Sequence, residues 1–127
     1  MWPDIETELV AWLTAILGGV RHCTELPADL LDVLPVNQIQ RAGGDDDRFR
    51  LDRALVSLDS YGATREAASL LARQTRLHLL GSLPGTSTAA AGFGRVATVS
   101  APAWRPYENP GLRRMGATYE IYFHPVS

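Results

Sequence analysis

The segment 92–97 reads Gly-Phe-Gly-Arg-Val-Ala, a spacing that could bind a dinucleotide. In Gly-x-Gly-x-x-Ala the glycines let backbone amides approach a pyrophosphate at the start of a helix. That chemistry requires the motif to follow a strand and to begin a helix. Here a loop composition precedes it and a strand pattern follows it, so we predict no nucleotide site. The chain also lacks Lys, which the Walker phosphate-binding motif requires.

The run Asp45-Asp46-Asp47 offers carboxylate oxygens, the ligands that calcium and magnesium prefer. Three consecutive residues seldom converge on one ion, and the alternating spacing and distal Glu of an EF-hand are missing. We therefore interpret the run as a solvated, acidic loop tip.

Three other acids, Asp52, Asp59 and Glu120, could form a pair for acid–base catalysis only if their strands were neighbours. Charges on the wet face of a sheet are the simpler interpretation. We therefore predict no catalytic, cofactor-binding or metal-binding residues and no enzyme activity. A small nucleotide- or metal-dependent enzyme, based on the Gly92 region or on the acidic run, is the alternative from a different class.

The histidines, His22, His78 and His124, have no ligand spacing, and no Gly-x-Ser-x-Gly elbow supplies a nucleophile for them. Cys23 is the single cysteine, which excludes an intrachain disulfide and a Cys-based zinc site. We interpret it as an idle or buried thiol in a reducing compartment.

Length and composition predict a single domain, residues 1–127, with one core. The chain is 46% hydrophobic and 20% charged, which disfavours global disorder. Its net charge of -2 argues against a dedicated nucleic-acid binder, which needs many cationic phosphate contacts. The N-terminal apolar run follows acidic residues rather than the positive charge of a secretory signal, and no run approaches the ~20 residues that cross a bilayer. We expect a protein in solution inside a cell, without membrane contact.

The N-terminal third predicts a helix and two short elements. Asp4 can cap a helix that ends at Gly18-Gly19 and buries one stripe, formed by Ile5, Leu9, Trp12, Leu13 and Ile16. A short extended piece is expected at 20–23, and a short helical turn after Pro27.

The middle of the chain predicts a hairpin and a second helix. Segments 36–42 and 49–60 should pair antiparallel, joined by a flexible tip over 43–48. From Ala63 the apolar period becomes helical and continues to about Gly81. Its expected buried positions are Ala67, Leu70, Leu71, Leu77 and Leu80.

The C-terminal third predicts a long loop over 81–92 and a second hairpin from strands 95–99 and 118–123. Trp104 and Tyr107 lie in the connection, where large aromatics either close the end of the core or anchor a partner. The fold class is therefore α+β: a mixed or antiparallel sheet of about four strands, in two hairpins, with two main helices packed on it.

These features together resemble the tail terminator, or tail completion, proteins of long-tailed non-contractile phages, over residues 5–125. The resemblance rests on the order and spacing of the N-terminal helix, the Arg41-Ala42-Gly43-Gly44 turn, the strand 52–59 that leads into a helix at Thr64, and the terminal strand 119–125 with its His-Pro end.

The resemblance implies a structural virion protein that assembles as a six-membered ring on the tail tube, stops its growth and joins the tail to the head. The implied partners are further copies of the chain, the tail tube protein and a head–tail connector or neck protein. DNA would pass through the ring without sequence-specific binding. The implied location is the virion tail or neck, and the host cytoplasm during assembly. Another neck component, a head-completion or connector protein, is the closest alternative.

We nominate three regions as subunit, tube or neck contacts. Their residues are Gly43, Gly44, Asp45, Asp46, Asp47 and Arg48 at the hairpin tip, Ser82, Pro84, Gly85 and Thr86 in the long loop, and Trp104, Tyr107, Arg113 and Arg114 near the second connection.

Overall fold

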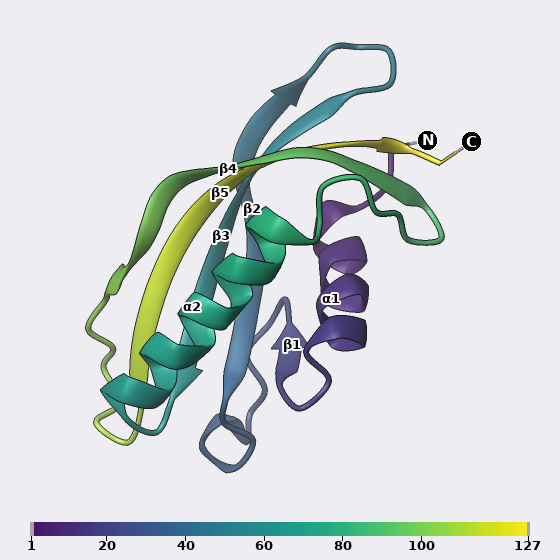
Figure 1. Ribbon diagram of the computed structural model, residues 1–127. Coiled ribbons are helices and arrows are strands. Elements are labelled where there is room, and N and C mark those ends of the chain that lie inside the picture. Colours follow the sequence, from purple (N-terminus) through teal and green to yellow (C-terminus); the bar gives the residue numbers. More distant parts are fainter. Residues whose placement is uncertain (1, 127) are drawn as a thin grey trace.

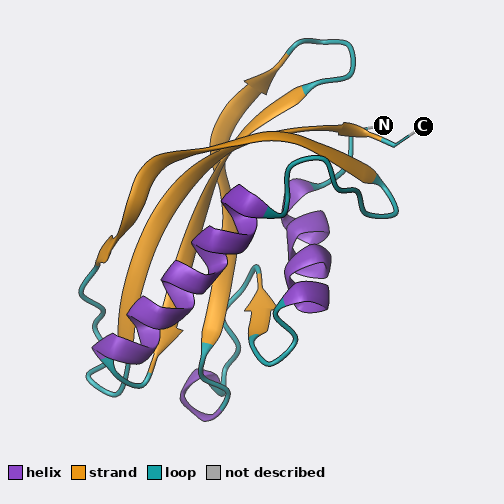
Figure 2. Cartoon of the chain, in the orientation of Figure 1, coloured by secondary structure: helices purple, strands orange, loops and turns teal. Residues whose placement is uncertain are grey.

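One curved sheet carries both helices on the same face (Figures 1 and 2). The computed structural model describes residues 2–126. Its elements are α1 (Ile5–Ile16), β1 (Arg21–Cys23), the 3-10 helix η1 (Leu30–Asp32), β2 (Val36–Asp46), β3 (Asp52–Gly62), α2 (Arg65–Gly81), β4 (Ala91–Trp104) and β5 (Arg113–Pro125). The α+β class and the two hairpins are confirmed.

The sheet has five strands in the order β1-β2-β3-β5-β4. The fifth strand is β1, the predicted extended piece, which pairs parallel to β2 at the edge. All other pairs are antiparallel. The two hairpins join through β3 and β5, so the last strand of the chain lies inside the sheet.

The predicted connection over 43–48 is wrong at both ends, because β2 continues through Gly43 and Gly44 to Asp46 and β3 begins only at Asp52. Both glycines have positive φ, 152° and 112°, and the register shifts between Arg41 and Gly43 as in a β-bulge. The bulge lets the strand bend and stay paired. A Gly-Gly dipeptide that reads as a turn is here part of the ladder.

The core lies between the sheet and the helices. Alternate residues of the two central strands point toward it: Ala54, Val56 and Leu58 from β3, and Ala117, Tyr119, Ile121 and Phe123 from β5, are all buried. α1 contributes Ile5, Leu9 and Leu13 to the same cluster, as its apolar spacing predicts, while Trp12 is partly buried against it. The predicted stripe is wrong at Ile16, which is 39% exposed at the end of the helix. Asp4 caps α1 by accepting a hydrogen bond from the Glu6 amide at 3.1 Å.

The rotation of α2 about its own axis differs from the prediction. Its buried residues are Ala68, Leu71, Ala72, Thr75 and Leu79. Leu70, Leu77 and Leu80 are instead 49%, 71% and 36% exposed. The first turn of α2 lies very close to the end of β3: a Cβ added to Gly62 would lie 2.6 Å from the Ala68 nitrogen.

A smaller apolar cluster covers the opposite face of the sheet at one end. Val36 of β2, Tyr61 of β3 and Leu112 are buried there beneath the segment 24–35 and Tyr107. The neighbouring residues Asn37 and Ser60 point to the other face, as strand alternation requires. There Asn37 donates to Thr75 of α2 at 2.9 Å and accepts from Ser60 at 2.7 Å.

Candidate functional site: the assembly surfaces

The β2–β3 tip is an ordered loop in which the aspartates satisfy backbone groups. Asp47 Oδ1 accepts the amides of Phe49, Arg50 and Leu51 at 2.9–3.0 Å. These hydrogen bonds to the ionised form lower the pKa of the Asp47 carboxyl, with the Phe49 amide the largest cause. Asp46 accepts the Arg48 amide at 2.7 Å. Asp46 and Asp47 therefore shape the turn, while Asp45 pairs with Arg53.

The predicted tip over 43–48 is acidic, with three Asp and one Arg and a formal charge of -2 (-3 + 1). The strands beside it supply further arginines, so the whole hairpin end, residues 41–53, holds four Asp and four Arg and has a formal charge of zero (-4 + 4). Arg53 pairs with Asp45 at 2.8 Å and with Glu120 at 2.7 Å, and Arg41 binds both oxygens of Asp52. What the tip presents is Phe49, with 85% of its surface exposed. The tip projects beyond the rest of the sheet (Figure 1).

The long loop between α2 and β4 is held by contacts inside the subunit. Leu83 is fully buried. The Gly85 amide donates to the Phe93 carbonyl, and the Phe93 amide donates to the Thr86 carbonyl, both at 2.9 Å. Gly85 has a φ of 86°, which favours glycine. Ser82 and Pro84 are exposed, so the nominated contact residues of this loop lie at the surface of an ordered turn.

Trp104 and Tyr107 are half-buried at the end of the sheet opposite the tip, but only Tyr107 lies in the β4–β5 connection, because β4 extends to Trp104. The rings of Tyr107 and Tyr61 pack edge-to-face, with their centroids 5.5 Å apart. The guanidinium carbon of Arg114 lies 5.0 Å from the centroid of the Tyr107 ring. Trp104 faces α2, where the Arg65 guanidinium lies 5.0 Å from its ring. Tyr107 packs against the smaller apolar cluster, and each of the two aromatics has a cationic partner. Contact of either with another protein stays a prediction.

The two nominated arginines of β5 face different groups. Arg113 donates to the Pro110 carbonyl at 2.8 Å and so fastens its own connection. Arg114 donates through Nη2 to the Pro106 carbonyl at 3.1 Å, and its Nε is buried without a hydrogen-bond partner.

The acids considered for catalysis do not converge. Asp52 is bound by Arg41, Glu120 by Arg53, and Asp59 lies 3.4 Å from Arg105. Burial raises the pKa of Asp59, while Arg114 and Arg105 oppose that shift. Three carboxylates with separate cationic partners form ion pairs and no proton-transfer pair.

The remaining candidates have structural surroundings. Gly92 lies within β4 against the His124 ring, so no helix begins there to receive a phosphate. Burial raises the pKa of the Cys23 thiol, which keeps it protonated. Across residues 2–126, no three or more His, Cys, Asp or Glu side chains are grouped as metal ligands would be.

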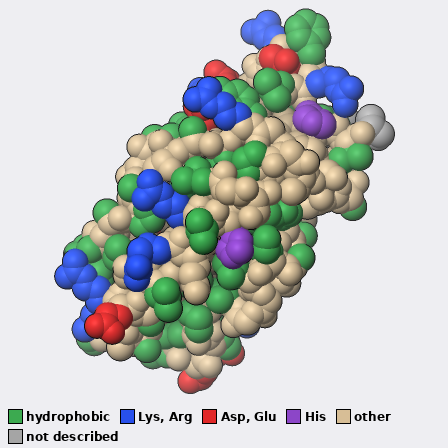
Figure 3. Space-filling view, in the orientation of Figure 1, with side chains coloured by type: hydrophobic (Ala, Val, Ile, Leu, Met, Phe, Trp, Pro, Cys, Tyr) green, Lys and Arg blue, Asp and Glu red, His purple; other side chains and the backbone are tan. Residues whose placement is uncertain are grey.

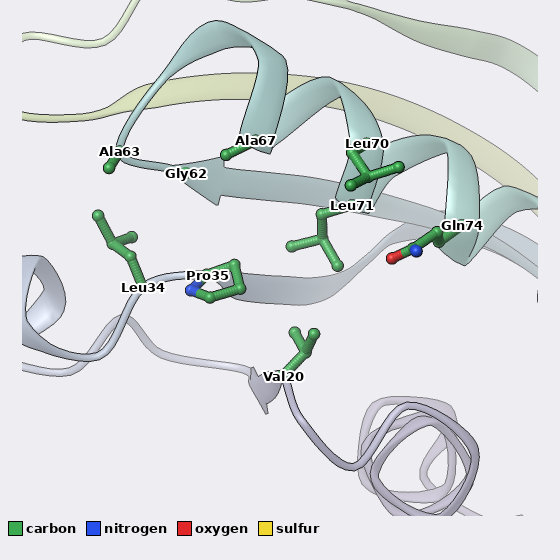
Figure 4. Close-up of a pocket in the computed structure, with 9 residues that line it drawn as sticks. All are labelled: Val20, Leu34, Pro35, Gly62, Ala63, Ala67, Leu70, Leu71 and Gln74. Carbon is green, nitrogen blue, oxygen red and sulfur yellow. The ribbon is translucent and has the colours of Figure 1, made fainter.

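An apolar hollow of about 230 Å³ lies between α2 and the β1–β2 side of the sheet (Figure 4). Its lining consists of Val20, Leu34, Pro35, Gly62, Ala63, Ala67, Leu70, Leu71 and Gln74. Gln74 is the one polar side chain among them. The hollow can bind an apolar group, but it offers no acid, base or nucleophile.

A comparison with protein families matches the description "phage tail termination protein" over residues 1–119. The chain belongs to this family. It is therefore a structural phage tail protein and a component of the virion, as the resemblance implied. A search of curated proteins finds no match. None of the helices in residues 2–126 has the length and apolar character needed to span a membrane.

Two further surfaces, which the sequence prediction did not nominate, expose apolar or charged side chains. One is the exposed side of α2 with Leu70 and Leu77, which the prediction placed in the core. The other is the segment 24–35, which has three acidic residues and no Lys or Arg. The uneven charge of this segment was readable from the sequence. The exposure of the leucines was not, because leucine recurs around the whole helix.

Proposed function

We propose that the chain caps the phage tail tube as a ring of identical subunits, stops tube polymerisation and presents the surface to which the head or neck binds. The family match across residues 1–119 carries this proposal. A tube grows by stacking like surfaces on one another. A ring with one face that fits the tube and another that does not will end the growth.

The shape of the subunit supports two unlike faces. One end of the sheet holds the β2–β3 tip with its exposed Phe49, flanked by Arg48 and Arg50. The opposite end holds the acidic segment 24–35 and the aromatic β4–β5 connection. Because the ends differ in charge and in apolar groups, each can bind a different partner: the tail tube protein at one and a connector or neck protein at the other.

The charge of the subunit suits a ring through which DNA passes. A formal charge of -2 and arginines that are partly paired with carboxylates do not provide the run of phosphate contacts that gives tight binding. The genome would then slide through without sequence-specific contacts. Assembly would take place in the host cytoplasm before the tail joins the head.

Electron microscopy of particles made without the protein tests the proposal. We expect tails longer than those of the parent phage, and restored length when the gene is supplied in trans. Tails of normal length that stay unattached to heads would contradict the termination role and would favour a head-completion or connector protein. Turnover of a substrate by the purified chain would contradict a purely structural role.

A further inference from the structure

The exposed side of α2 combines apolar and cationic side chains. Leu70, Leu77 and Leu80 project from one side of the helix, and Arg73 and Arg76 lie beside them. The last two leucines and both arginines border a shallow hollow at the surface. Figure 3 shows blue arginine and green hydrophobic side chains next to one another over α2. We call these five residues the α2 stripe.

The α2 stripe lacks an internal partner. The ion pairs found within residues 2–126 involve Arg41, Arg53 and Arg105, so Arg73 and Arg76 have none there. Leu77 is 71% exposed in the middle of a well-formed helix. Isolated exposed leucines are ordinary, but three on one side of a helix with two arginines resemble the centre and rim of an interface.

The segment 24–35 has the complementary character. Glu25, Asp29 and Asp32 are exposed, no cation lies in the segment, and its formal charge is -3. None of the three is in an ion pair of the described chain. Leu31, between two of these acids, is 50% exposed although its neighbour Leu30 packs inward. We call Glu25, Asp29, Leu31 and Asp32 the acidic loop.

The two surfaces lie on opposite faces of the sheet. α2 packs on the face to which Asn37 and Ser60 point, as the Asn37–Thr75 hydrogen bond shows. The acidic loop packs over Val36 and Tyr61, which point to the other face. The acidic loop and the α2 stripe of one subunit therefore do not face each other, so a contact between two such surfaces would join different copies.

We propose that the α2 stripe of one subunit docks on the acidic loop of the next, with Leu31 between the leucines and the carboxylates at Arg73 and Arg76. The two patches differ, so the contact is head-to-tail and leaves one free patch of each kind. Such a contact repeats until a ring closes. This proposal rests on the ring of the proposed function and assigns its subunit interface.

The β2–β3 tip is a weaker occupant for the α2 stripe. The hairpin end that carries it has a formal charge of zero, and its aspartates bind arginines or backbone amides within that end. The hairpin end has no net charge for Arg73 and Arg76 to neutralise. The acidic loop, with three unpaired carboxylates around an exposed leucine, meets both requirements.

Cysteine cross-linking tests the contact in a Cys23→Ser background. Leu31→Cys combined with Leu77→Cys places one thiol in each patch. Both side chains are exposed, so neither substitution disturbs the core. We expect oxidation to give a ladder of covalent oligomers. The control combines Leu31→Cys with Val99→Cys, a 57% exposed site on β4 outside both patches, and should cross-link roughly tenfold more slowly or not at all. Equal rates for the two pairs would overturn the proposal.

Charge reversal provides the second arm. In the cross-linkable protein, Arg73→Glu with Arg76→Glu, or Asp29→Arg with Asp32→Arg, should each weaken association roughly tenfold. All four changes in one chain should restore it, because the reversed stripe then meets a reversed loop. Restoration also excludes misfolding as the cause of the loss. Loss without restoration would overturn the proposal.

Cross-linking of the same cysteine pairs is also measured in purified tails. This covers the case in which the protein forms a ring only when it is bound to the tube. Absence of Leu31–Leu77 cross-links in tails of normal length would reject this interface while leaving the termination role intact. Normal tail length without the protein would reject the termination role itself. If Phe49→Ser abolishes assembly and charge reversal does not, the tip is the occupant and the assignment is wrong.

Discussion

Gly44 has a conformation and an environment that exclude a side chain. Its φ is 112°, and an added Cβ would lie 1.9 Å from the Arg53 carbonyl oxygen across the ladder. The bulge that curves the β2–β3 hairpin depends on this close approach.

We predict that Gly44→Ala lowers the free energy of unfolding by about 2–4 kcal/mol, from backbone strain and the clash combined. Urea unfolding followed by circular dichroism measures it. Gly81→Ala is the matched control, because nothing lies within 4 Å of its added Cβ and its φ is ordinary. Similar unfolding midpoints for the two variants would contradict the bulge geometry.

His22 is a buried histidine whose surroundings favour the neutral ring. Nε2 lies 3.1 Å from the Leu17 carbonyl oxygen and Nδ1 lies 3.4 Å from the Asn37 amide nitrogen. When the ring proton is on Nε2, Nδ1 can accept a hydrogen bond from the side-chain amide of Asn37. A second proton, on Nδ1, would point at that amide donor and remove the hydrogen bond. Burial lowers the pKa of His22 below 6.5, although the Leu17 hydrogen bond opposes the shift.

The sign of the pH effect follows from that lowered pKa. Below pH 6.5 the unfolded state takes up the histidine proton first, so acidification favours unfolding until the folded pKa is passed. We predict that the stability advantage of the wild type over His22→Gln shrinks between about pH 7 and pH 5. Chemical denaturation at each pH measures it, and a constant or growing difference would contradict the neutral buried ring.

At the scale of elements, α2 offers two leucines of the same helix with opposite exposure. Leu79 is fully buried and Leu77 is 71% exposed. We predict that Leu79→Ala lowers the free energy of unfolding by about 2–5 kcal/mol, from lost burial and the cavity left behind. Leu77→Ala should change it by less than about 0.5 kcal/mol. Denaturant titration of the monomer compares them, and equal losses would mean that the helix is rotated differently.

Local sequence patterns predict where helices and strands form. Which side of a helix is buried, and which strands become neighbours, depends instead on contacts between residues far apart in the chain. The alternation in β3 and the caps at Asp4 and Thr64 act within a few residues, so both helices and both hairpins could be predicted. The buried side of α2 could not, because leucine recurs all round it. The close approach at Gly62 fixes only the first turn of α2, next to Ala67 and Ala68.

The assembly surfaces were predictable only in part, for the same reason. The aspartates of the tip are evident from the sequence. The position of Arg53, opposite Asp45 in the ladder and paired with it, is not. The sequence displays the aromatics at 104 and 107, but not the cations stacked on them. The pairing of β1 with β2 is parallel and needs a crossover, which leaves no turn signature.

At the scale of the whole molecule, the unpaired charges predict that self-association depends on salt. Raising the salt concentration from 0.1 M to 1 M shortens the screening length from about 10 Å to about 3 Å. The attraction between Arg73 or Arg76 and the acidic loop should then weaken, while the apolar contact around Leu31 persists. We expect the mass measured by sedimentation to fall with salt without complete dissociation. Oligomers that grow with added salt would point to a purely apolar interface.

The position of β5 has a consequence for how the chain comes off the ribosome. β5 follows the other four strands in the sequence, yet it lies between β3 and β4 and joins them in one ladder. Until β5 is added, the nascent chain consists of two separate pieces, each with an open strand edge that can recruit neighbours and aggregate. A chain shortened before Arg113 would therefore keep two unpaired strand edges, on β3 and β4, and would be prone to aggregate.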